Sequence, residues 1–175
     1  MGGRFALLRL AAVAVLAVTP VMAAEEPAKP APAAAPGKLM ERITGEDLLS
    51  IVQEIGWAGE LTVTDKGIPV VLGLYRDANG NEYDFQAGLY RCEENKGCFD
   101  IVLTRSFEAK KPATLQMVNA YNQSQLFGCA YLTSDGKLGI SMSQTIQGGA
   151  TRQTVKEILD WWREVMENAE TKIAP

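Results

Sequence analysis

The sequence contains no histidine among its 175 residues, and this absence excludes a large class of chemistry. Serine and cysteine triads with a histidine base cannot form, and neither can zinc sites supported by imidazole. Calcium loops of the EF-hand type are also missing. A glycine pair occurs at Gly148 and Gly149, but no P-loop lysine or dinucleotide-binding glycine pattern surrounds it. The sequence therefore predicts no metal site and no cofactor.

The acidic residues and lysines do not combine into a catalytic group either. Asp77, Asp84, Asp100 and Asp135 fall in predicted turns or on solvent-facing strand positions, where no apolar segment would raise the pKa of a carboxyl group. The lysines fall in turns or at strand ends, so a serine-lysine mechanism lacks its dry pocket. We therefore expect no catalytic residues and a protein that is not an enzyme. A carboxylate-based hydrolase is the least favoured alternative.

A secretory signal peptide is predicted over residues 1–23. An apolar run from Leu10 to Val18 is preceded by Arg4 and Arg9, and no acidic residue occurs in this stretch. An uncleaved anchor is the less favoured alternative, because the apolar run is shorter than the roughly 20 residues that a bilayer span needs. Cleavage would give a periplasmic protein without a membrane span. Residues 24–42 are rich in alanine and proline and should form a flexible tether.

The charge of the mature chain bears on its partners. Removal of the signal peptide lowers the count of lysine and arginine from 17 to 15 against 21 acidic residues, so the net charge becomes −6. Nucleic acid is not expected as a partner, because no basic patch is present to neutralise phosphates. The remaining chain is long enough for one core, so we predict a single domain over residues 43–170 and a C-terminal tail over residues 171–175.

Capping signals and residue alternation predict an α+β fold for this domain. Thr44 and Asp47 form a capping-box-like pair, so the first helix should run from Gly45 to Ile55. A second helix should begin near Pro112 and continue to about Gln125. Between the helices, alternation predicts a four-strand antiparallel meander. The predicted strands are Glu60 to Thr64, Ile68 to Arg76, Asn81 to Cys92, and Cys98 to Phe107.

A β-hairpin and a third helix should complete the domain. The strands Leu126 to Leu132 and Leu138 to Gln144 flank a turn that contains an Asp-Gly pair. Gly148 and Gly149 should form a strand-to-helix joint, and the Thr151 hydroxyl should cap a helix that begins at Arg152. Apolar residues at helical spacing predict one buried stripe on this helix. The stripe comprises Val155, Ile158, Leu159, Trp162, Val165 and Met166.

The region from the hairpin to the last helix resembles the YbjN-domain family of small bacterial proteins. The similar features are Phe127 to Leu132, Asp135-Gly136, the step from Gly148 to Thr151, and the tryptophan-containing helix. The resemblance covers roughly residues 44–167. It implies a fold similar to type III secretion chaperones and, for some members, a regulatory role in sensory transduction. It also implies that a homodimer is a candidate state, because chaperone-fold relatives often form one.

Two further positions take meaning from this resemblance. Tyr121 and Asn122 stand where family members usually show Trp-Asn, so Asn122 is expected to be a buried hydrogen-bonding residue that holds the hairpin. Cys92 and Cys98 resemble a cysteine pair that is common in secreted members.

The spacing of the cysteines points to a disulfide independently. Cys92 and Cys98 bracket a polar turn, and strand alternation lets them face each other in an oxidising compartment. A redox-active or metal-binding pair is the alternative, but five intervening residues do not match the C-x-x-C spacing of either chemistry. Cys129 is expected to be a small core residue.

Recognition of a partner is the function that remains. Strand alternation predicts an outer sheet face that carries Val71, Tyr75, Tyr90 and Val102. Helical spacing places Trp161 at the edge of the apolar stripe of the last helix. Tyr75, Tyr90 and Trp161 are therefore candidate partner-binding residues, although each could instead pack within the domain. We expect a binding, chaperone-like or regulatory module for a protein or peptide in the bacterial envelope. A sensor of a small molecule or an envelope polymer is the alternative.

Overall fold

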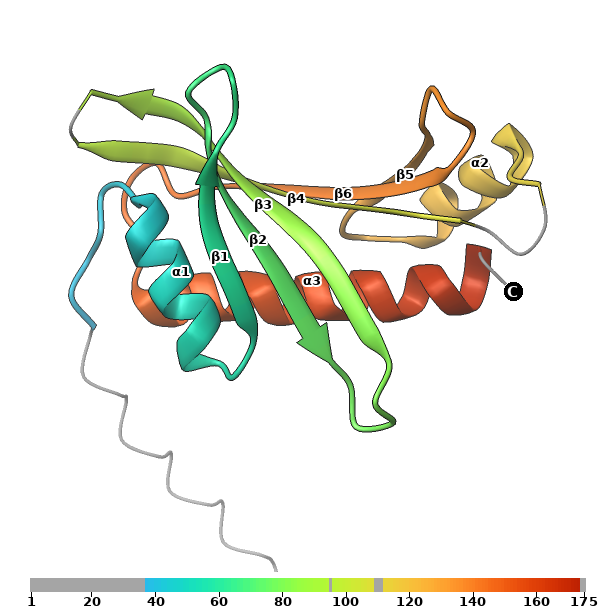
Figure 1. Ribbon diagram of the computed structural model, residues 1–175, viewed down its shortest axis with the longest axis horizontal. Helices are drawn as coiled ribbons and strands as arrows, with labels where there is room; N and C mark the ends of the chain where they lie inside the picture. Colours follow the sequence, from blue (N-terminus) through green and yellow to red (C-terminus); the bar gives the residue numbers. More distant parts are fainter. Residues whose placement is uncertain (1–36, 95, 109–111, 174–175) are drawn as a thin grey trace, which may run out of the picture. The chain divides into compact units, whose positions relative to one another are not determined.

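The computed structural model describes residues 37–94, 96–108 and 112–173. The predicted signal peptide lies outside these residues. The predicted α+β order of helix, four strands, helix, hairpin and helix is confirmed (Figure 1). The elements are α1 (Gly45–Glu54), β1 (Ala58–Val63), β2 (Pro69–Arg76), β3 (Glu82–Glu93), β4 (Gly97–Phe107), α2 (Leu115–Ser124), β5 (Cys129–Leu132), β6 (Leu138–Thr145) and α3 (Arg152–Ile173).

The strands form one antiparallel sheet in the order β1-β2-β3-β4-β6-β5. The first four strands make the predicted meander, and the hairpin joins it through β6, which pairs with β4. In Figure 1, α3 runs along one face of this sheet with α1 beside it. The opposite face carries exposed side chains such as Leu72 and Tyr90, each 41% exposed. The sheet therefore has one face against the helices and one face in solvent, as is common for antiparallel sheets.

The core lies between the sheet and α3. The predicted apolar stripe of α3 is confirmed, because all six of its side chains are buried. Trp162 is fully buried at the centre of this stripe and meets sheet residues such as Ile101 and Leu103 in a single core cluster. Truncation of a buried tryptophan typically costs 3–5 kcal/mol, so this side chain is a principal source of stability.

The first two helices begin at threonine caps. In α1 the capping box is confirmed: the Asp47 amide donates to Thr44 Oγ1 over 3.1 Å, and the Thr44 amide donates to the Asp47 carboxylate over 3.3 Å. Helix α2 begins at Leu115 rather than at Pro112, because the Thr114 hydroxyl accepts from the Met117 amide and fixes the start there.

The segment before α1 is part of the domain, which corrects the predicted extent of the flexible tether to residue 42. Met40 and Ala150 exchange two backbone hydrogen bonds of 2.7 and 2.9 Å. Arg42 donates to the Glu93 carboxylate over 2.7 Å. These contacts hold the segment before α1 against the β6–α3 joint and against the end of β3.

The joint between β6 and α3 has the predicted form. Gly148 and Gly149 have φ angles of 97° and 102°, a region that residues with a side chain rarely adopt. The Thr151 hydroxyl accepts from the Thr154 amide over 3.1 Å, so Thr151 caps α3 as expected. At the other end, α3 continues to Ile173, whose side chain is 1% exposed. The predicted tail is therefore corrected: residues 171–173 belong to the helix.

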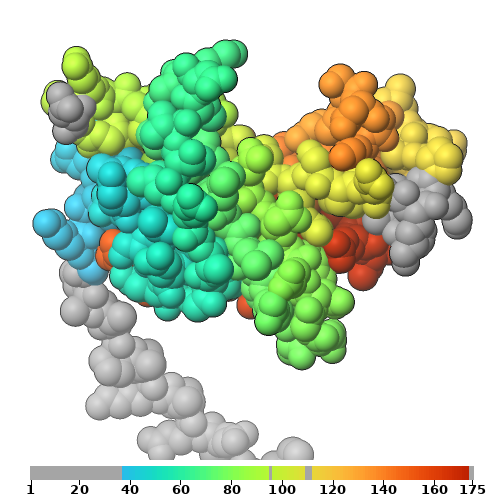
Figure 2. Space-filling view, viewed as in Figure 1, coloured from blue at the N-terminus to red at the C-terminus, as the bar shows by residue number. Residues whose placement is uncertain are grey.

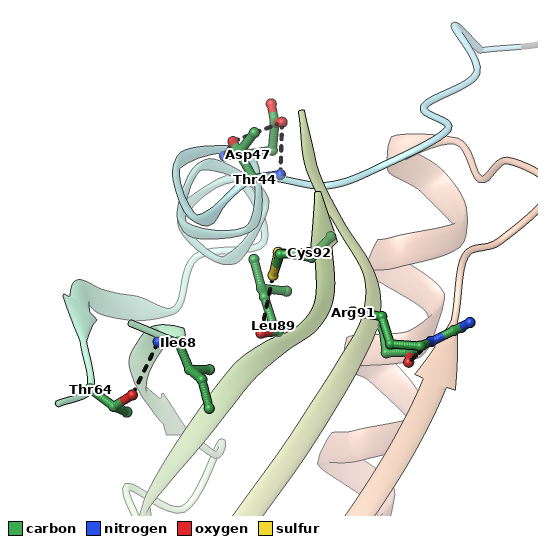
Figure 3. The surroundings of a disulfide bond; sticks show 9 residues. Thr44, Asp47, Thr64, Ile68, Leu89, Arg91 and Cys92 are labelled. Carbon is green, nitrogen blue, oxygen red and sulfur yellow. Dashed lines mark hydrogen bonds and ion pairs between the residues drawn. A yellow bond between two sulfur atoms is a disulfide. The ribbon is translucent and has the colours of Figure 1, made fainter. Parts of the chain in front are cut away.

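The predicted disulfide between Cys92 and Cys98 is confirmed. The two residues are direct partners in the β3–β4 pairing. Figure 3 shows Cys92 turned toward Leu89, while the Arg91 side chain extends on the other side of the strand. Arg91 has a φ of 49°, which reverses the local alternation beside the disulfide. Ile43 pairs with Cys98 through backbone hydrogen bonds of 3.0 and 2.8 Å, so the bridge is anchored to the start of the domain.

Candidate functional site: the groove beside Phe127 and Trp161

The connection between α2 and β5 carries Leu126, which at 94% is the most exposed large apolar side chain among the described residues, next to a groove. Helix α2 ends at Ser124, and Gln125 adopts extended backbone angles. Gly128 has a φ of 74° and turns the chain into β5, so the strand begins at Cys129. The prediction that this strand starts at Leu126 is therefore wrong. Leu126 and Phe127 lie in a short loop and project outward instead.

Phe127 stacks on Trp161 of α3. The two ring centroids are 5.1 Å apart and the ring planes differ by 8°. Both rings remain in contact with solvent, with 45% of Phe127 and 38% of Trp161 exposed, and the neighbouring Leu126 is 94% exposed. Stacking fixes both rings, so this surface is a rigid aromatic face rather than a pair of free side chains.

A groove of about 250 Å³ lies next to this aromatic pair. One wall comes from the α2–β5 loop and the other from α3. Its polar lining comes from Glu164 and Asn168 on α3, from Ser124 at the end of α2 and from Gln125 of the loop. We call this feature the aromatic groove; its apolar lining is Leu126, Phe127, Trp161 and Val165. An apolar floor with a single carboxylate at its edge suits a segment that carries an apolar side chain next to a basic one.

Asn122 holds β5 beside the groove. Its Nδ2 group donates to the Ala130 carbonyl over 3.1 Å, and its Oδ1 atom accepts from the Ala130 amide over 2.7 Å. The amide side chain thus pairs with the free edge of β5 as a neighbouring strand would. The expected role of Asn122 in holding the hairpin is confirmed, whereas its expected burial is wrong, because the residue is exposed.

Tyr121 forms the inner support of the same region. It is 3% exposed, and its hydroxyl donates to the Val165 carbonyl over 3.4 Å. Burial of the phenol raises the pKa of Tyr121 to about 12, and the nearby Cys129 thiolate would add to this rise. Tyr121 therefore remains neutral at physiological pH and braces α2 against α3.

Tyr75 does not lie on the outer face, which corrects one of the candidate binding residues. It pairs with Tyr83 across β2 and β3 and packs between the rings of Trp57 and Tyr83, at centroid distances of 5.1 and 5.5 Å. Its hydroxyl donates to Glu167 of α3 over 2.9 Å. Burial, followed by this hydrogen bond to a carboxylate, raises the pKa of Tyr75 to about 12. Val71 is fully buried on the same face.

Predictions were also made for the positions of Tyr90 and Cys129. Tyr90 does lie on the outer face, as expected, but it is far along β3 from the Phe127–Trp161 pair and lines none of the described pockets. Cys129 was expected in the core, and this prediction is wrong: its side chain is exposed, with its Sγ atom 3.1 Å from Ser141 Oγ. The structure therefore separates Tyr75, Tyr90 and Trp161 and unites only Trp161 with a groove.

Leu126 and Phe127 are the site residues that sequence reasoning missed. Their apolar character was attributed to a strand, although Gly128 directly follows them. A glycine between a helix end and a strand is a turn signal. It could have indicated that the two apolar residues precede the strand and lie at the surface.

The described residues also limit other kinds of site. Among residues 37–94, 96–108 and 112–173, no three His, Cys, Asp or Glu side chains are grouped so as to hold a metal ion. No described helix combines the length and the apolar character that crossing a membrane requires.

Comparison with known proteins agrees with the resemblance noted in the sequence. Residues 44–174 match the family model YbjN, described as "Putative bacterial sensory transduction regulator". No curated protein matches the chain.

Proposed function

The chain belongs to the YbjN family, and on this premise we propose that it is a non-catalytic binding module. It recognises a protein or peptide in the bacterial envelope through the aromatic groove. One observation carries the proposal: the stacked pair of Phe127 and Trp161 stays open to solvent beside a leucine that is 94% exposed. Aromatic residues are enriched at protein interfaces, and tryptophan is enriched among binding hot spots.

The chemistry of the groove describes the partner. A large apolar side chain of the partner would cover Phe127 and Trp161 and so remove both rings from water. A neighbouring lysine or arginine of the partner would approach Glu164 at the edge of the groove. The net negative charge of the mature chain favours the same kind of segment.

The envelope location rests on the predicted signal peptide and on the disulfide. A bond between Cys92 and Cys98 persists in an oxidising compartment and is rare in the bacterial cytoplasm. A regulatory module that is exported would act on another envelope component or on a second copy of itself.

Site-specific photo-crosslinking tests this proposal. A photoreactive phenylalanine analogue replaces Leu126, which makes few contacts that would be lost, and the intact cells are irradiated. We expect an adduct whose yield falls at least about tenfold when Phe127→Ser and Trp161→Ala are added, since hot-spot truncations cost 2 kcal/mol or more. Peptide mapping of the adduct identifies the partner segment, and a peptide of this same chain would identify a homodimer.

Tyr90 provides the matched control. It is 41% exposed, close to the 45% of Phe127, but it lies outside the groove. The same analogue at Tyr90 should give no adduct with that partner. An equal adduct from Tyr90, or an adduct from Leu126 that survives loss of both aromatic rings in a folded protein, would contradict the proposal.

A further inference from the structure

The sheet divides at the end that faces away from the disulfide. Strands β3 and β4 pair only as far as Gln86 and Thr104. Beyond this point, the first residues of β3 pair with β2 alone, and the last residues of β4 pair with β6 alone. Figure 1 shows β3 turning away while β4 continues beside β6, and in Figure 2 the two branches form separate projections with part of α3 visible between them.

A cavity of about 380 Å³ occupies this fork on the outer side of the sheet. We call it the fork pocket; the side chains that matter for the argument are Asp84, Gln86, Thr104, Arg105, Ser106 and Tyr131. They come from three different strands, and all of them offer hydrogen-bonding groups. The volume falls within the range of small-molecule sites in proteins.

Tyr131 supplies an aromatic wall. It is paired directly with Gly139 on β6, and a Cβ atom at position 139 would lie only 2.3 Å from Tyr131 Cζ. The ring therefore lies flat over the glycine, and its position depends on the absence of a side chain there. Because Gly139 also pairs with Ser106, the ring is held beside the polar wall that β4 provides.

Arg105 forms the floor of the fork pocket. It is only 8% exposed, and its Nη2 group donates to Glu170 of α3 over 2.9 Å. Its Nε atom lies 3.5 Å from Asp84 Oδ1 without forming a hydrogen bond, and Nε and Nη1 are both buried with no hydrogen-bond partner among the described residues. The guanidinium group lies over the rings of Tyr83 and Phe107, 5.0 and 5.2 Å from their centroids, so Arg105 closes the floor of the fork pocket and leaves the exposed carboxylate of Asp84 open to a ligand.

The open side chains of this pocket suit a ligand with hydroxyl groups. A hydroxyl can donate to Asp84, whose side chain is 79% exposed, and accept from a neighbouring hydroxyl or amide at the same time. Gln86, Thr104 and Ser106 each provide both donors and acceptors. The pocket thus combines bifunctional polar groups and one carboxylate with one flat aromatic ring.

From this combination we propose that the fork pocket binds a neutral saccharide unit, with the sugar ring against Tyr131 and its hydroxyls on the polar wall. A saccharide presents hydroxyls around its rim and C–H groups on its faces, which match the two kinds of wall. This proposal does not depend on the proposed function, because the fork pocket and the aromatic groove share no lining residue.

Chemical-shift mapping of the isotope-labelled protein tests the proposal. The probes are neutral trisaccharides of glucose, galactose, mannose and N-acetylglucosamine at about 10 mM, which detects a Kd in the millimolar range. At least one should shift the amide signals of Gln86, Thr104 and Ser106. Tyr131→Ala should raise its Kd about tenfold, the effect of losing one well-placed aromatic contact. Thr104→Val, which is nearly isosteric, should also weaken binding while leaving the fold intact.

Tyr90→Ala is the matched control on the same face of the sheet and should leave the Kd within about twofold. The proposal is overturned if no trisaccharide shifts these amides, or if the shifts occur elsewhere in the domain. It is also overturned if inorganic phosphate shifts the same amides at lower concentration, because the pocket would then be an anion site. Unchanged affinity of a folded Tyr131→Ala variant would equally reject it.

Discussion

The two ends of β4 show opposite ways of finishing the same sheet. At its start, a disulfide joins Cys92 to Cys98, the backbone of Ile43 pairs with Cys98, and Arg42 binds Glu93. At its far end, β5 is held by the side chain of Asn122, and the adjoining loop exposes Leu126. We call these regions the disulfide end and the aromatic end.

The difference shows where the chain leaves apolar surface uncovered. At the disulfide end, Cys98 is 2% exposed and Ile43 is fully buried, so the bridge also closes the core. At the aromatic end, the strand edge is closed by two side-chain hydrogen bonds while a stacked aromatic pair stays open. Edge strands are usually blocked to prevent unwanted pairing. Here Asn122 blocks the edge of β5 next to the open groove.

The largest expected effect comes from removing the clamp at the aromatic end. Asn122→Ala leaves the amide and the carbonyl of Ala130 without their partner, and Ala130 is 4% exposed. The free energy of unfolding should fall by about 2–3 kcal/mol, as measured by urea denaturation. Hydrogen exchange at Ala130 should accelerate.

Asn119→Ala is the control for this change. Asn119 lies on the same helix, is exposed, and makes no side-chain hydrogen bond within the described residues. Its replacement should change stability by less than about 0.5 kcal/mol. Equal stability of the two variants would show that Asn122 does not hold β5.

A somewhat smaller effect is expected from opening the disulfide end. Replacing both Cys92 and Cys98 by Ala removes a cross-link that closes a short loop, and this should lower the free energy of unfolding by about 2 kcal/mol. Reduction of the wild-type protein should give the same loss. Cys129→Ser should have almost no effect, because that thiol is exposed. A loss after Cys129→Ser that matches the double variant would contradict the assignment of roles.

The smallest effect concerns Arg91 beside the disulfide. Its guanidinium group binds Asp100 and also donates to Thr145 over 3.0 Å, and the hydrogen bond from Arg91 lowers the pKa of Asp100. The carboxylate form is thus favoured in the folded state. The stabilisation is present above the unfolded pKa of Asp100 and disappears as the pH falls through the lower, folded value.

Arg91→Ala should cost at most about 1 kcal/mol at neutral pH, because the Arg91 side chain is 52% exposed. Arg91→Gly removes the same ion pair but suits the positive φ at this position. The glycine variant should therefore be the more stable of the two in urea denaturation at pH 7, and both should show a weaker loss of stability in acid than the wild type. A less stable glycine variant would exclude strain at Arg91.

Local signals in the sequence predicted much of the fold. The capping box of Thr44 and Asp47, the joint at Gly148 and Gly149, and the cap at Thr151 each depend on residues within a few positions of one another. Such features are decided by short-range hydrogen bonds and backbone preference, so a single sequence can reveal them. The disulfide was also predictable, since a short polar turn brings both cysteines into register.

Features that depend on distant contacts were predicted less well. Alternation groups Val71 with Tyr75 on one face of β2, but it does not say which face the helices cover. The pairing of Gly73 with Phe85 decides which face is covered. The Phe85 ring lies over Gly73, where a Cβ atom would be 2.1 Å from the ring, so the face that carries Val71 and Tyr75 packs in the core. Likewise, nothing local joins Phe127 to Trp161, which are separated by the whole hairpin. The aromatic groove could therefore be found only in the folded structure.

Hydrogen exchange tests the central claim most directly. It is measured on the protein alone and on the protein mixed with the partner that crosslinking identifies, with the two proteins purified separately. We expect slower exchange in residues 124–127 and 161–168, which contain the lining of the aromatic groove, and unchanged exchange around the disulfide end. Slower exchange confined to residues 42–44 and 92–98, with the aromatic groove unaffected, would contradict it.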